Sequence, residues 1–490
     1  MASIYHSTRG TDQVCGAKEA VLNGIAPDGG LYVTDALGSA ALDLNKVVGQ
    51  TFQQIAADVL ATLLDDYTRE EIESCVDAAY VGTFDAPEVT PLVPVEDQYV
   101  LELFHGPTSA FKDVALQMLP QLMSRATGEQ HIMILTATSG DTGKAALAGF
   151  ANTPGLGISV FFPHGGTSAI QRLQMVTQPG DNVAVAAVRG NFDDTQSTVK
   201  AIFADKELAA RLAEKNIVLS SANSINVGRL APQVTYYFDA YAQLVRAGKI
   251  NVGDEVEFCV PTGNFGDVLA GYFAKNMGLP VAKLIVASNA NNILTDFLTT
   301  GVYDRNRPFH KTISPSMDIL ISSNLERLLY YASKGDTAYV AQLMADLKET
   351  GRYEVREDIL AGIRELFDCG CADDDMARES MAECYKQTGY VLDPHTAVGW
   401  NVSKRIPCKA AARVVLSTAS PFKFCRDVCD ALGFNAEGSD FDCLRELEKQ
   451  TGLAAPAALA ALESADVRFE DVIAKDEMPA FVEAKCGELL

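Results

Sequence analysis

The segment His105-Gly106-Pro107-Thr108-Ser109-Ala110-Phe111-Lys112-Asp113 places a lysine among aromatic, apolar and small residues. It contains a Gly-Pro turn and precedes the apolar run Val114–Leu119, which is typical of a helix. A lysine amine in an apolar wall loses hydration of its charged form, so its pKa falls and the free amine becomes available. Such an amine forms Schiff bases with carbonyl compounds. The alternative is a lysine that reaches solvent from the start of an amphipathic helix, with Asp113 as a capping charge.

Short apolar runs alternate with helical patterns on both sides of this segment. Residues 99–104 alternate like a strand that leads into it, and residues 114–125 continue it as a helix. Further apolar runs, typical of buried strands, lie at 132–135, 158–162, 183–188, 217–219, 256–260, 284–286 and 414–416. Helical patterns at 144–150, 195–215 and 228–247 lie between them. This alternation predicts an α/β fold around parallel sheets.

The chain of 490 residues is long enough for more than one domain. Residues 1–95 are expected to form a helical N-terminal domain. It contains helical apolar spacing at Val47, Phe52, Ile55, Val59 and Leu63. A turn at Asp28-Gly29-Gly30 precedes a short strand at 31–33.

Residues 96–433 are expected to form the main body, with a smaller subdomain at about 130–247. Residues 304–387 are polar, with helical patterns at 324–332, 336–350 and 358–367, and are interpreted as an insertion beside the core. Residues 434–490 form an acidic, helical tail, for which we expect a packing role.

Composition excludes several classes of function. The net charge of −24 argues against nucleic-acid binding, which needs a basic surface, so an anionic substrate would require a local positive pocket. The 11 cysteines form only two close pairs, Cys369/Cys371 and Cys425/Cys429, without partners for a metal site. The first ten residues are polar and do not resemble a signal peptide. No apolar run approaches the ~20 residues of a membrane span, so we expect a cytoplasmic protein.

Two loops have the character of anion sites. Thr138-Ser139-Gly140-Asp141-Thr142-Gly143-Lys144 joins an expected strand to a helix, where glycine and free amides allow close approach of an anion. A nucleotide-binding P-loop would need glycine at 138 and serine or threonine at 145, but Thr138 and Ala145 stand there. Pro261-Thr262-Gly263-Asn264-Phe265-Gly266-Asp267 again follows a strand and opens a helix, which suits a phosphate dianion. A purely structural turn is the alternative for each.

Three further segments carry polar groups at expected helix starts. The segment 221–230 contains Asn223, Ser224 and Arg229, and arginine binds tetrahedral oxyanions through two charge-assisted hydrogen bonds. The alternative there is a capped helix with a surface arginine. Thr418 follows the strand at 414–416, where a helix cap is the alternative. His395 lies in segment 393–399, where we expect an orienting or packing role.

Together these segments resemble the threonine synthase family. The string HGPTSAFKD, followed by Leu116-Gln117, is similar to that family's cofactor-lysine signature, and residues 263–267 are similar to its GNFGD phosphate loop. The segments 24–33 and 393–399 also resemble the family, although Thr34 stands where proline is usual. Ser420 replaces a frequent histidine, and Asp141 stands where shorter homologues have asparagine. The similar segments extend from Ser7 to about Phe424.

The resemblance implies a pyridoxal-phosphate enzyme of fold type II, with two open, mainly parallel sheets flanked by helices. It implies that Lys112 is catalytic and holds the cofactor, and that metal is not required. The implied cofactor-binding residues are Phe111, Lys112, Gly263, Asn264, Phe265, Gly266 and Thr418. The implied substrate-binding residues are Thr138, Ser139, Gly140, Asp141, Thr142, Asn223, Ser224 and Arg229.

The implied reaction converts O-phospho-L-homoserine and water to L-threonine and phosphate, the last step of threonine biosynthesis. Asp113 is expected to orient the lysine loop. Two alternatives stay open: another pyridoxal-phosphate lyase of the same fold, such as threonine dehydratase, and an inactive binding protein that resembles threonine synthase. The substrate is a small molecule, without nucleic acid or membrane as partner, and the protein is expected to be a monomer or homodimer.

Overall fold

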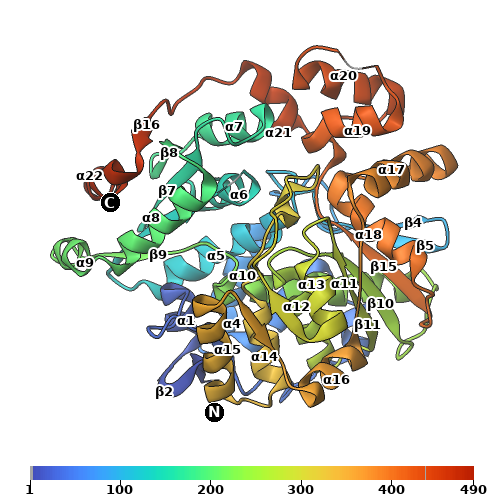
Figure 1. Cartoon of the computed structure of the whole chain (residues 1–490), viewed down its shortest axis with the longest axis horizontal. Helices are drawn as coiled ribbons and strands as arrows, with labels where there is room; N and C mark the ends of the chain where they lie inside the picture. Colours follow the sequence, from blue (N-terminus) through green and yellow to red (C-terminus); the bar gives the residue numbers. More distant parts are fainter. Residues whose placement is uncertain (1–3, 139, 436) are drawn as a thin grey trace.

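Two parallel sheets organise the protein, and their loops meet between them (Figure 1). The structure is a computed structural model that describes residues 4–138, 140–435 and 437–490. The larger sheet has the strand order β14-β11-β10-β15-β5-β4, built from Phe367–Cys371, Val281–Ser288, Val256–Pro261, Ala412–Ser417, Gln98–Glu102 and Leu92–Val95. Only the edge strand β4 is antiparallel to its neighbour. The smaller sheet is wholly parallel, in the order β16-β8-β7-β6-β9, built from Val472–Ala474, Val183–Arg189, Leu156–Pro163, His131–Ala137 and Ile217–Ser220.

The smaller sheet is covered on both faces, which explains why its strands read as continuous apolar runs. All eight residues of β7 are buried. Along β6, Ile132 and Ile134 pack on one face, in the same core as residues of α6 (Asp141–Phe150) and α7 (Ala169–Val176). Met133 and Leu135 pack on the other face, with residues of α8 (Phe192–Ala204), α9 (Lys206–Ala213) and α22 (Met478–Leu489). The expected fold class, two open and mainly parallel sheets flanked by helices, is confirmed.

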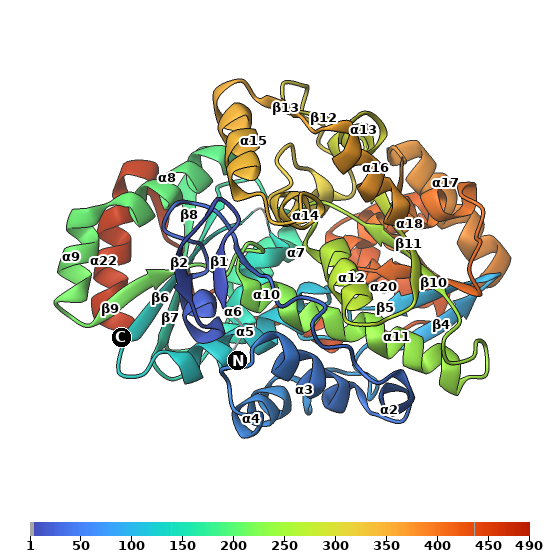
Figure 2. The same ribbon diagram turned by 90° about the horizontal axis from the view of Figure 1, so that it is seen from below.

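The N-terminal segment is less helical than expected. A small antiparallel sheet of order β2-β1-β3, built from Gly10–Cys15, Tyr5–Ser7 and Tyr32–Thr34, accompanies α1 (Ala17–Asn23), α2 (Leu44–Val48), α3 (Phe52–Leu63) and α4 (Arg69–Tyr80). The side chains that gave the helical apolar spacing are all buried. Figure 2 shows α2, α3 and α4, in blue, below α5 (Lys112–Ala126) and α11 (Val234–Arg246), which these helices contact. The segment therefore supports the helices that lie between the two sheets.

The residues from 304 to 387 do not form a separate insertion. The three helices expected in this tract are α14 (Leu325–Ala332), α15 (Thr337–Glu349) and α16 (Glu357–Leu366). A fourth helix, α17 (Asp374–Thr388), follows α16. Between the last two lies β14, which pairs in parallel with β11 at the edge of the larger sheet. The interpretation as an insertion beside the core is corrected to this extent, because part of the tract is built into the sheet.

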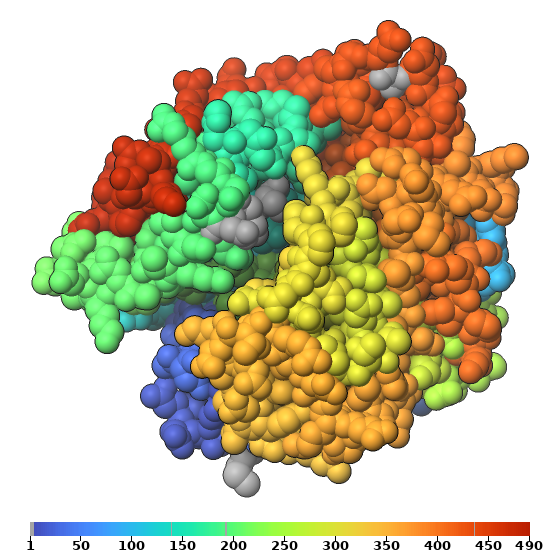
Figure 3. All heavy atoms as spheres, in the orientation of Figure 1, coloured from blue at the N-terminus to red at the C-terminus, as the bar shows by residue number. Residues whose placement is uncertain are grey.

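The C-terminal tail connects the two halves of the molecule (Figure 3). Helix α20 (Asp440–Thr451) packs in the core beside the larger sheet, through Leu444 and Leu447. Strand β16 then pairs with β8 of the smaller sheet, and α22 covers that sheet through Met478 and Val482. The tail thus fastens both sheets and has the packing role expected from its sequence.

In the described part of the chain, no helix is both long enough and apolar enough to cross a membrane. The same residues contain no group of three or more histidine, cysteine, aspartate or glutamate side chains placed to hold a metal ion.

Met478→Ala is expected to loosen the smaller sheet, because it leaves a cavity under α22. Truncating a buried methionine costs roughly 2–5 kcal/mol. Hydrogen exchange of the β6 and β7 amides should become faster in the variant, while Glu488→Ala on the exposed side of α22 should leave it unchanged. Unchanged exchange in Met478→Ala would show that α22 does not stabilise the sheet.

Candidate active site

The predicted site residues lie on loops that follow strands of both sheets. The lysine segment follows β5, residues 138–141 follow β6, residues 221–226 follow β9, residues 262–266 follow β10, and Thr418 follows β15. In open α/β sheets, ligands bind in the crevice outside the carboxyl ends of the strands. The topology therefore brings together five segments that are up to about 300 residues apart in sequence.

Lys112 is the first residue of α5, and its amine is held within the protein. Lys112 Nζ lies 3.4 Å from Ser316 Oγ and 5.8 Å from the centre of the Phe111 ring. The pKa of Lys112 is lowered to about 8, chiefly by burial, with the charges of Lys423 and Arg229 adding to the lowering and that of Asp141 opposing it. The amine is therefore easier to deprotonate than an ordinary lysine, as the sequence predicted.

The lysine loop is fixed by its neighbours on both sides. Asp113 is buried, and its carboxylate accepts hydrogen bonds from Thr108 N at 2.8 Å and Thr108 Oγ1 at 2.6 Å. Phe111 N donates to Thr418 O at 2.9 Å, and Ser420 N donates to Ser109 O at 3.1 Å. Asp113 thus holds the loop closed, as expected, and the backbone places Thr418 beside the residue that precedes Lys112.

The glycine loop after β10 presents free amides at a helix start. Phe265 has a left-handed backbone with φ of 64°, and α12 (Gly266–Asn276) begins at the next residue. The amides of Gly263, Asn264 and Phe265 donate to no acceptor among the described residues. Their carbonyl side is anchored instead, since Ser322 Oγ donates to Gly263 O at 2.7 Å and Asn324 N donates to Asn264 O at 3.0 Å. Free amides at a helix start form an anion site.

Close packing explains one of the glycines. A Cβ atom added at Gly263 would lie 2.8 Å from the carbonyl oxygen of Ser316. Any other residue there would push the backbone around Ser316 away, and Ser316 contacts the Lys112 amine. The loop therefore needs glycine at this position for the contact between residues 263 and 316. The side chain of Phe265 points into the core, beside the Phe367 ring, so its amide is what faces the loop's open side.

Arg229 is a buried cation without a carboxylate partner among the described residues. It lies on α10 (Val227–Leu230), is 3% exposed, and donates from Nη1 to Ala222 O at 2.7 Å. Its Nε is buried and has no hydrogen-bond partner among the described residues. Burial lowers the pKa of Arg229 to about 10, which leaves the guanidinium charged at neutral pH. The surface arginine considered as an alternative is excluded, and a donor remains for an anion.

The backbone just before Arg229 is held by α14 and the residue at its start, which also fixes the glycine loop. Asn324 Nδ2, at the start of α14, donates to Ser224 O at 3.1 Å. The fully buried Arg327 donates from Nη2 to Ile225 O at 2.6 Å. Asn226 caps α10 by accepting from Gly228 N at 2.8 Å, while Asn223 N donates to Ser221 Oγ at 3.2 Å. The segment 223–229 and the loop 263–266 therefore share one rigid support.

The loop after β6 is closed by Thr138 and glycine. Thr138 Oγ1 accepts from Gly140 N and Gly143 N, each at 3.0 Å. Gly140 has φ of 154°, and a Cβ atom there would meet the Gln171 side chain at 2.6 Å. Thr142 lies in the first turn of α6, partly exposed. Ser139, also expected to bind substrate, lies outside the described residues.

Asp141 differs from the expectation of a side chain open to substrate. Its carboxylate receives hydrogen bonds from Gln171 Nε2 at 3.0 Å and Ser316 Oγ at 3.0 Å, and pairs with Lys423 Nζ at 2.9 Å. Although burial alone would raise the pKa of Asp141, Lys423 and Lys112 hold it well below its usual range. Asp141 is therefore an ionised group already occupied by protein donors.

Thr418 and His395 have different surroundings. The Thr418 hydroxyl makes no hydrogen bond to the described residues, and the turn at Pro421–Phe424 is capped instead by Ser420 Oγ, which accepts from Phe422 N at 3.3 Å. The helix-cap alternative for Thr418 is therefore wrong.

His395 Nδ1 lies 2.9 Å from Asp393 Oδ1, and its Nε2 accepts from Ser316 N at 3.2 Å. His395 orients the backbone beside Lys112, in line with the orienting role expected for it.

Four neighbours of the site were not singled out from the sequence: Ser316, Ser322, Asn324 and Lys423. The first three belong to the tract that was interpreted as an insertion, and a lone serine or asparagine there carries no local signal. Lys423 did carry one, because Phe422-Lys423-Phe424 is again a lysine among aromatic residues, as in Phe111-Lys112.

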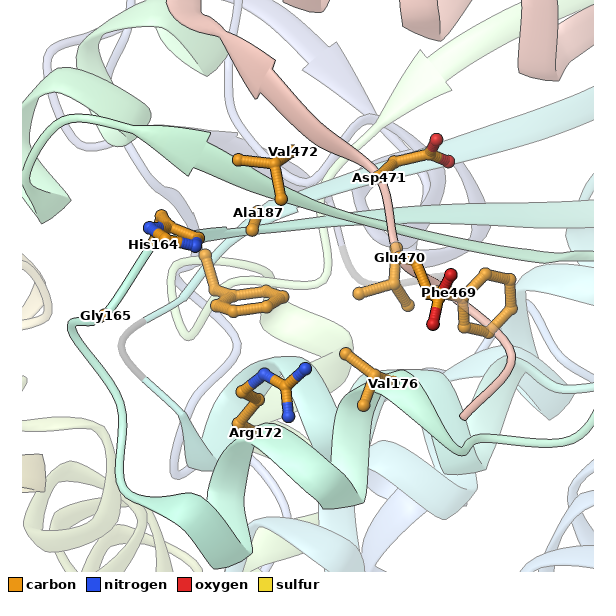
Figure 4. Close-up of a pocket in the computed structure, with 11 residues that line it drawn as sticks. His164, Gly165, Arg172, Val176, Ala187, Phe469, Glu470, Asp471 and Val472 are labelled. Atoms are coloured by element: carbon orange, nitrogen blue, oxygen red, sulfur yellow. The ribbon is translucent and has the colours of Figure 1, made fainter. Parts of the chain in front are cut away.

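A separate hollow lies on the smaller sheet, between α7 and the extended residues 469–472 (Figure 4). It has a volume of about 190 Å³ and an apolar floor that includes Phe162, Val185 and Ala187. His164 and Arg172 lie at its rim in Figure 4, and both side chains are exposed. None of the predicted site residues lines it.

The fold and the lysine site are those of pyridoxal-phosphate-dependent enzymes, and the family model with that description matches residues 84–417. Two further models, described as the N terminus and the C-terminal part of threonine synthase, match residues 4–80 and 396–482. The chain belongs to the threonine synthase family.

Individual relatives agree along nearly the whole chain. The threonine synthase of Pseudomonas aeruginosa is 40% identical over 428 residues, which cover 86% of this chain and 88% of the relative. The crystal structure of pyridoxal-phosphate-bound threonine synthase from Brucella melitensis superposes with a TM-score of 0.89 at 38% identity, covering 99% of this chain and all of that one. The yeast threonine synthase structure gives a TM-score of 0.87 at 34% identity and 99% coverage of both chains.

The lowered pKa of Lys112 predicts a pH-dependent reactivity of its amine. Only the unprotonated amine is nucleophilic, so reductive methylation of Lys112 in the cofactor-free protein should rise with pH through a midpoint of about 8. Peptide mass spectrometry at a series of pH values gives the curve, with the exposed Lys249 as reference. A midpoint in the ordinary lysine range, about 10.4, would show that the amine is not desolvated.

Proposed function

We propose that this protein is a threonine synthase, which converts O-phospho-L-homoserine and water to L-threonine and phosphate. One observation carries the proposal beyond family membership: two separate anion sites flank one lysine of lowered pKa. The first is the set of free amides at 263–265, and the second is the buried Arg229 without a carboxylate partner among the described residues. A phosphorylated cofactor together with a phosphorylated substrate requires two such sites.

The residues fit pyridoxal phosphate. The free amides of Gly263, Asn264 and Phe265, with Gly266 at the helix start, suit its phosphate, and Lys112 suits its aldehyde. Phe111 contributes an aromatic ring beside the lysine, and Thr418 a neutral hydroxyl without other partners among the described residues. When bound, the cofactor supplies an electron sink that makes the α and β protons of an amino acid removable.

Lys112 moves the protons of the reaction. With the cofactor bound, the unprotonated Lys112 amine would take the proton from Cα and then one from Cβ. Phosphate would depart from Cγ, and one of the two protons would return to Cγ. Water would add its hydroxyl at Cβ and give its proton to the released phosphate, and Lys112 would return the other proton to Cα. A pKa of about 8 leaves enough free base near neutral pH to take the protons and makes the conjugate acid strong enough to return them.

The substrate is held at its two charged ends. Arg229, with Asn223 and Ser224, binds the phosphate group through charge-assisted hydrogen bonds. Thr138, Ser139, Gly140, Asp141 and Thr142 are proposed to bind the substrate carboxylate, where free amides precede α6, which begins at Asp141. Positive charge from Arg229 and Lys112 attracts the dianionic substrate into a protein whose net charge is −24.

The organisation of the chain completes the proposal. Residues 1–95 form an N-terminal domain, 96–433 the catalytic core with a smaller subdomain at about 130–247, and 434–490 the tail. The protein acts in the cytoplasm as a monomer or homodimer, with small molecules as its partners and no role for nucleic acid.

The proposal predicts that the purified holoenzyme releases inorganic phosphate from O-phospho-L-homoserine and forms L-threonine in equal amount. Two alternatives are separated in the same assay. A threonine dehydratase would instead form 2-oxobutyrate from L-threonine, and a binding protein without activity would change the cofactor absorbance on adding substrate but release no phosphate. Either result in place of threonine formation would contradict the proposal.

Arg229→Ala should weaken binding of the phosphorylated substrate. Removing one partner of a buried, charge-assisted contact costs roughly 2–5 kcal/mol, so the Michaelis constant should rise while the absorbance of the bound cofactor is kept. Arg211→Ala, on the exposed surface of α9, is the matched control. Steady-state kinetics decide, and an unchanged Michaelis constant and turnover would place the substrate phosphate elsewhere.

Thr418→Asp should change the course of the reaction. The family resemblance implies that Thr418 would face the pyridine nitrogen of the cofactor. A neutral hydroxyl there would not favour protonation of that nitrogen, whereas a carboxylate would raise its pKa. We expect a shifted cofactor spectrum and a lower ratio of threonine to 2-oxobutyrate and pyridoxamine phosphate. Thr418→Val is the matched neutral control. Wild-type values of both the ratio and the spectrum in Thr418→Asp would show that Thr418 does not face the cofactor.

A further inference from the structure

Lys423 is a buried lysine that the proposed reaction does not use. It lies in the turn Pro421–Phe424 that follows β15, and its side chain is fully buried. Its Nζ lies 2.9 Å from Asp141 Oδ1 and donates to Thr108 O at 3.0 Å. One ammonium group therefore joins three loops: the turn after β15, the loop after β6 and the loop that carries Lys112.

This ion pair crosses from one sheet to the other. Lys423 lies in the turn after β15 of the larger sheet, and Asp141 begins α6 after β6 of the smaller sheet. Burying two charges costs much of what their attraction returns, so such a pair is weak evidence for stability. Breaking it by removing one partner is far more costly, because the other charge is left buried and unpaired. A role in specificity or catalysis is therefore the better account of its position.

The pair is connected to the Lys112 amine through one serine. Asp141 Oδ2 accepts a hydrogen bond from Ser316 Oγ at 3.0 Å, and Ser316 Oγ lies 3.4 Å from Lys112 Nζ. Gln171 Nε2 holds Asp141 Oδ1 from the other side, at 3.0 Å. Lys423 thus fixes the carboxylate that fixes Ser316, which in turn contacts the catalytic amine.

The charges around Lys423 show what would happen without it. The charge of Lys423 lowers the pKa of two neighbouring carboxylates, Asp141 and Asp113. It also lowers the pKa of two neighbouring lysines, Lys112 and Lys144. Removal of Lys423 would take its ion-pair partner from the buried Asp141 carboxylate at the start of α6, and would leave Lys112 as the neighbouring cation. A like charge placed opposite a ligand charge weakens binding, and in the proposed function the substrate brings its own carboxylate to this place.

We propose that Lys423 is a positioning residue for the proposed reaction: it cancels the charge of Asp141, so that the start of α6 accepts the substrate carboxylate, and it holds Ser316 against Lys112. The inference rests on the proposed function and assigns a role to a side chain that does not itself touch the reacting atoms. Lys423 also lowers the pKa of Lys112, so its loss should move the protonation of the catalytic amine as well as substrate binding.

Three variants of the holoenzyme test the proposal: Lys423→Met, Asp141→Asn and the double variant. In Lys423→Met the Michaelis constant for O-phospho-L-homoserine should rise roughly tenfold to a hundredfold. In a plot of turnover number against pH, the acid limb should move to higher pH. The pKa of Lys112 rises when the cation of Lys423 is lost while the negative charge of Asp141 remains. The double variant removes both charges. Its Michaelis constant should be at least about threefold lower than that of Lys423→Met, and the acid limb of its pH profile should move back towards that of the wild type. Lys449→Met, an exposed lysine on α20, is the control.

Two results would overturn the proposal. The first is a wild-type Michaelis constant and pH profile in Lys423→Met. The second is a double variant no better than Lys423→Met, since a residue that only packs would gain nothing from the loss of Asp141's charge. If Lys423→Met does not fold or bind cofactor, Asp141→Asn decides alone. Its acid limb should move to lower pH, because Asp141 raises the pKa of Lys112, and an unmoved limb would contradict the proposal.

The same variants separate this inference from the proposed function. If the wild-type enzyme forms no threonine from O-phospho-L-homoserine, the function is wrong and kinetics cannot test Lys423. The reactivity of Lys112 towards reductive methylation still can. Its midpoint, about 8 in the wild type, should move to higher pH in Lys423→Met and to lower pH in Asp141→Asn. Midpoints that stay at the wild-type value in both variants would overturn the electrostatic coupling itself.

Discussion

Positive charge is gathered, out of water, where the loops of the two sheets meet. Lys112, Lys423 and Arg229 each contribute to the same local potential, and burial together with mutual repulsion lowers the pKa of Lys112 to about 8. Such a cluster would be unfavourable without compensation, and the protein supplies it with two buried carboxylates, Asp141 and Asp113. Arg229 is the exception, because no carboxylate among the described residues pairs with it. The arrangement fits a site completed by anions from solution.

The rest of the structure holds these charges at fixed positions. Each of the two sheets contributes loops from the carboxyl ends of its strands, and neither sheet alone contains the whole site. Helix α14 fastens the glycine loop and the Arg229 segment together through Asn324 and Arg327. The N-terminal segment secures α14 in turn, since Arg9 pairs with Glu326 at 2.8 Å. The tail completes the assembly by adding β16 and α22 to the smaller sheet.

Most strands of the two sheets could be predicted from the sequence, because buried parallel strands require continuous apolar runs. The lysine segment, the glycine loop and the position of Thr418 follow from local patterns together with family resemblance. Some features are not local. The pattern at 195–215 reads as one helix but forms two, because Asp205 caps the second by accepting from Glu207 N and Leu208 N, each at 3.0 Å. Ser316 and Asn324 matter only through contacts made across the fold, and β16 is too short to be recognised before its partner strand is known.

The central claim is that Lys112 is the residue that carries pyridoxal phosphate. Two other lysines, Lys423 and Lys144, are also held inside the protein near it, so the assignment can fail in a definite way. Borohydride reduction of the holoenzyme, followed by proteolysis and mass spectrometry, fixes the cofactor to the lysine that holds it. The account predicts a single modified lysine, Lys112, with loss of the modification in Lys112→Ala. A modification on Lys423 or Lys144, with Lys112 unmodified, would contradict it.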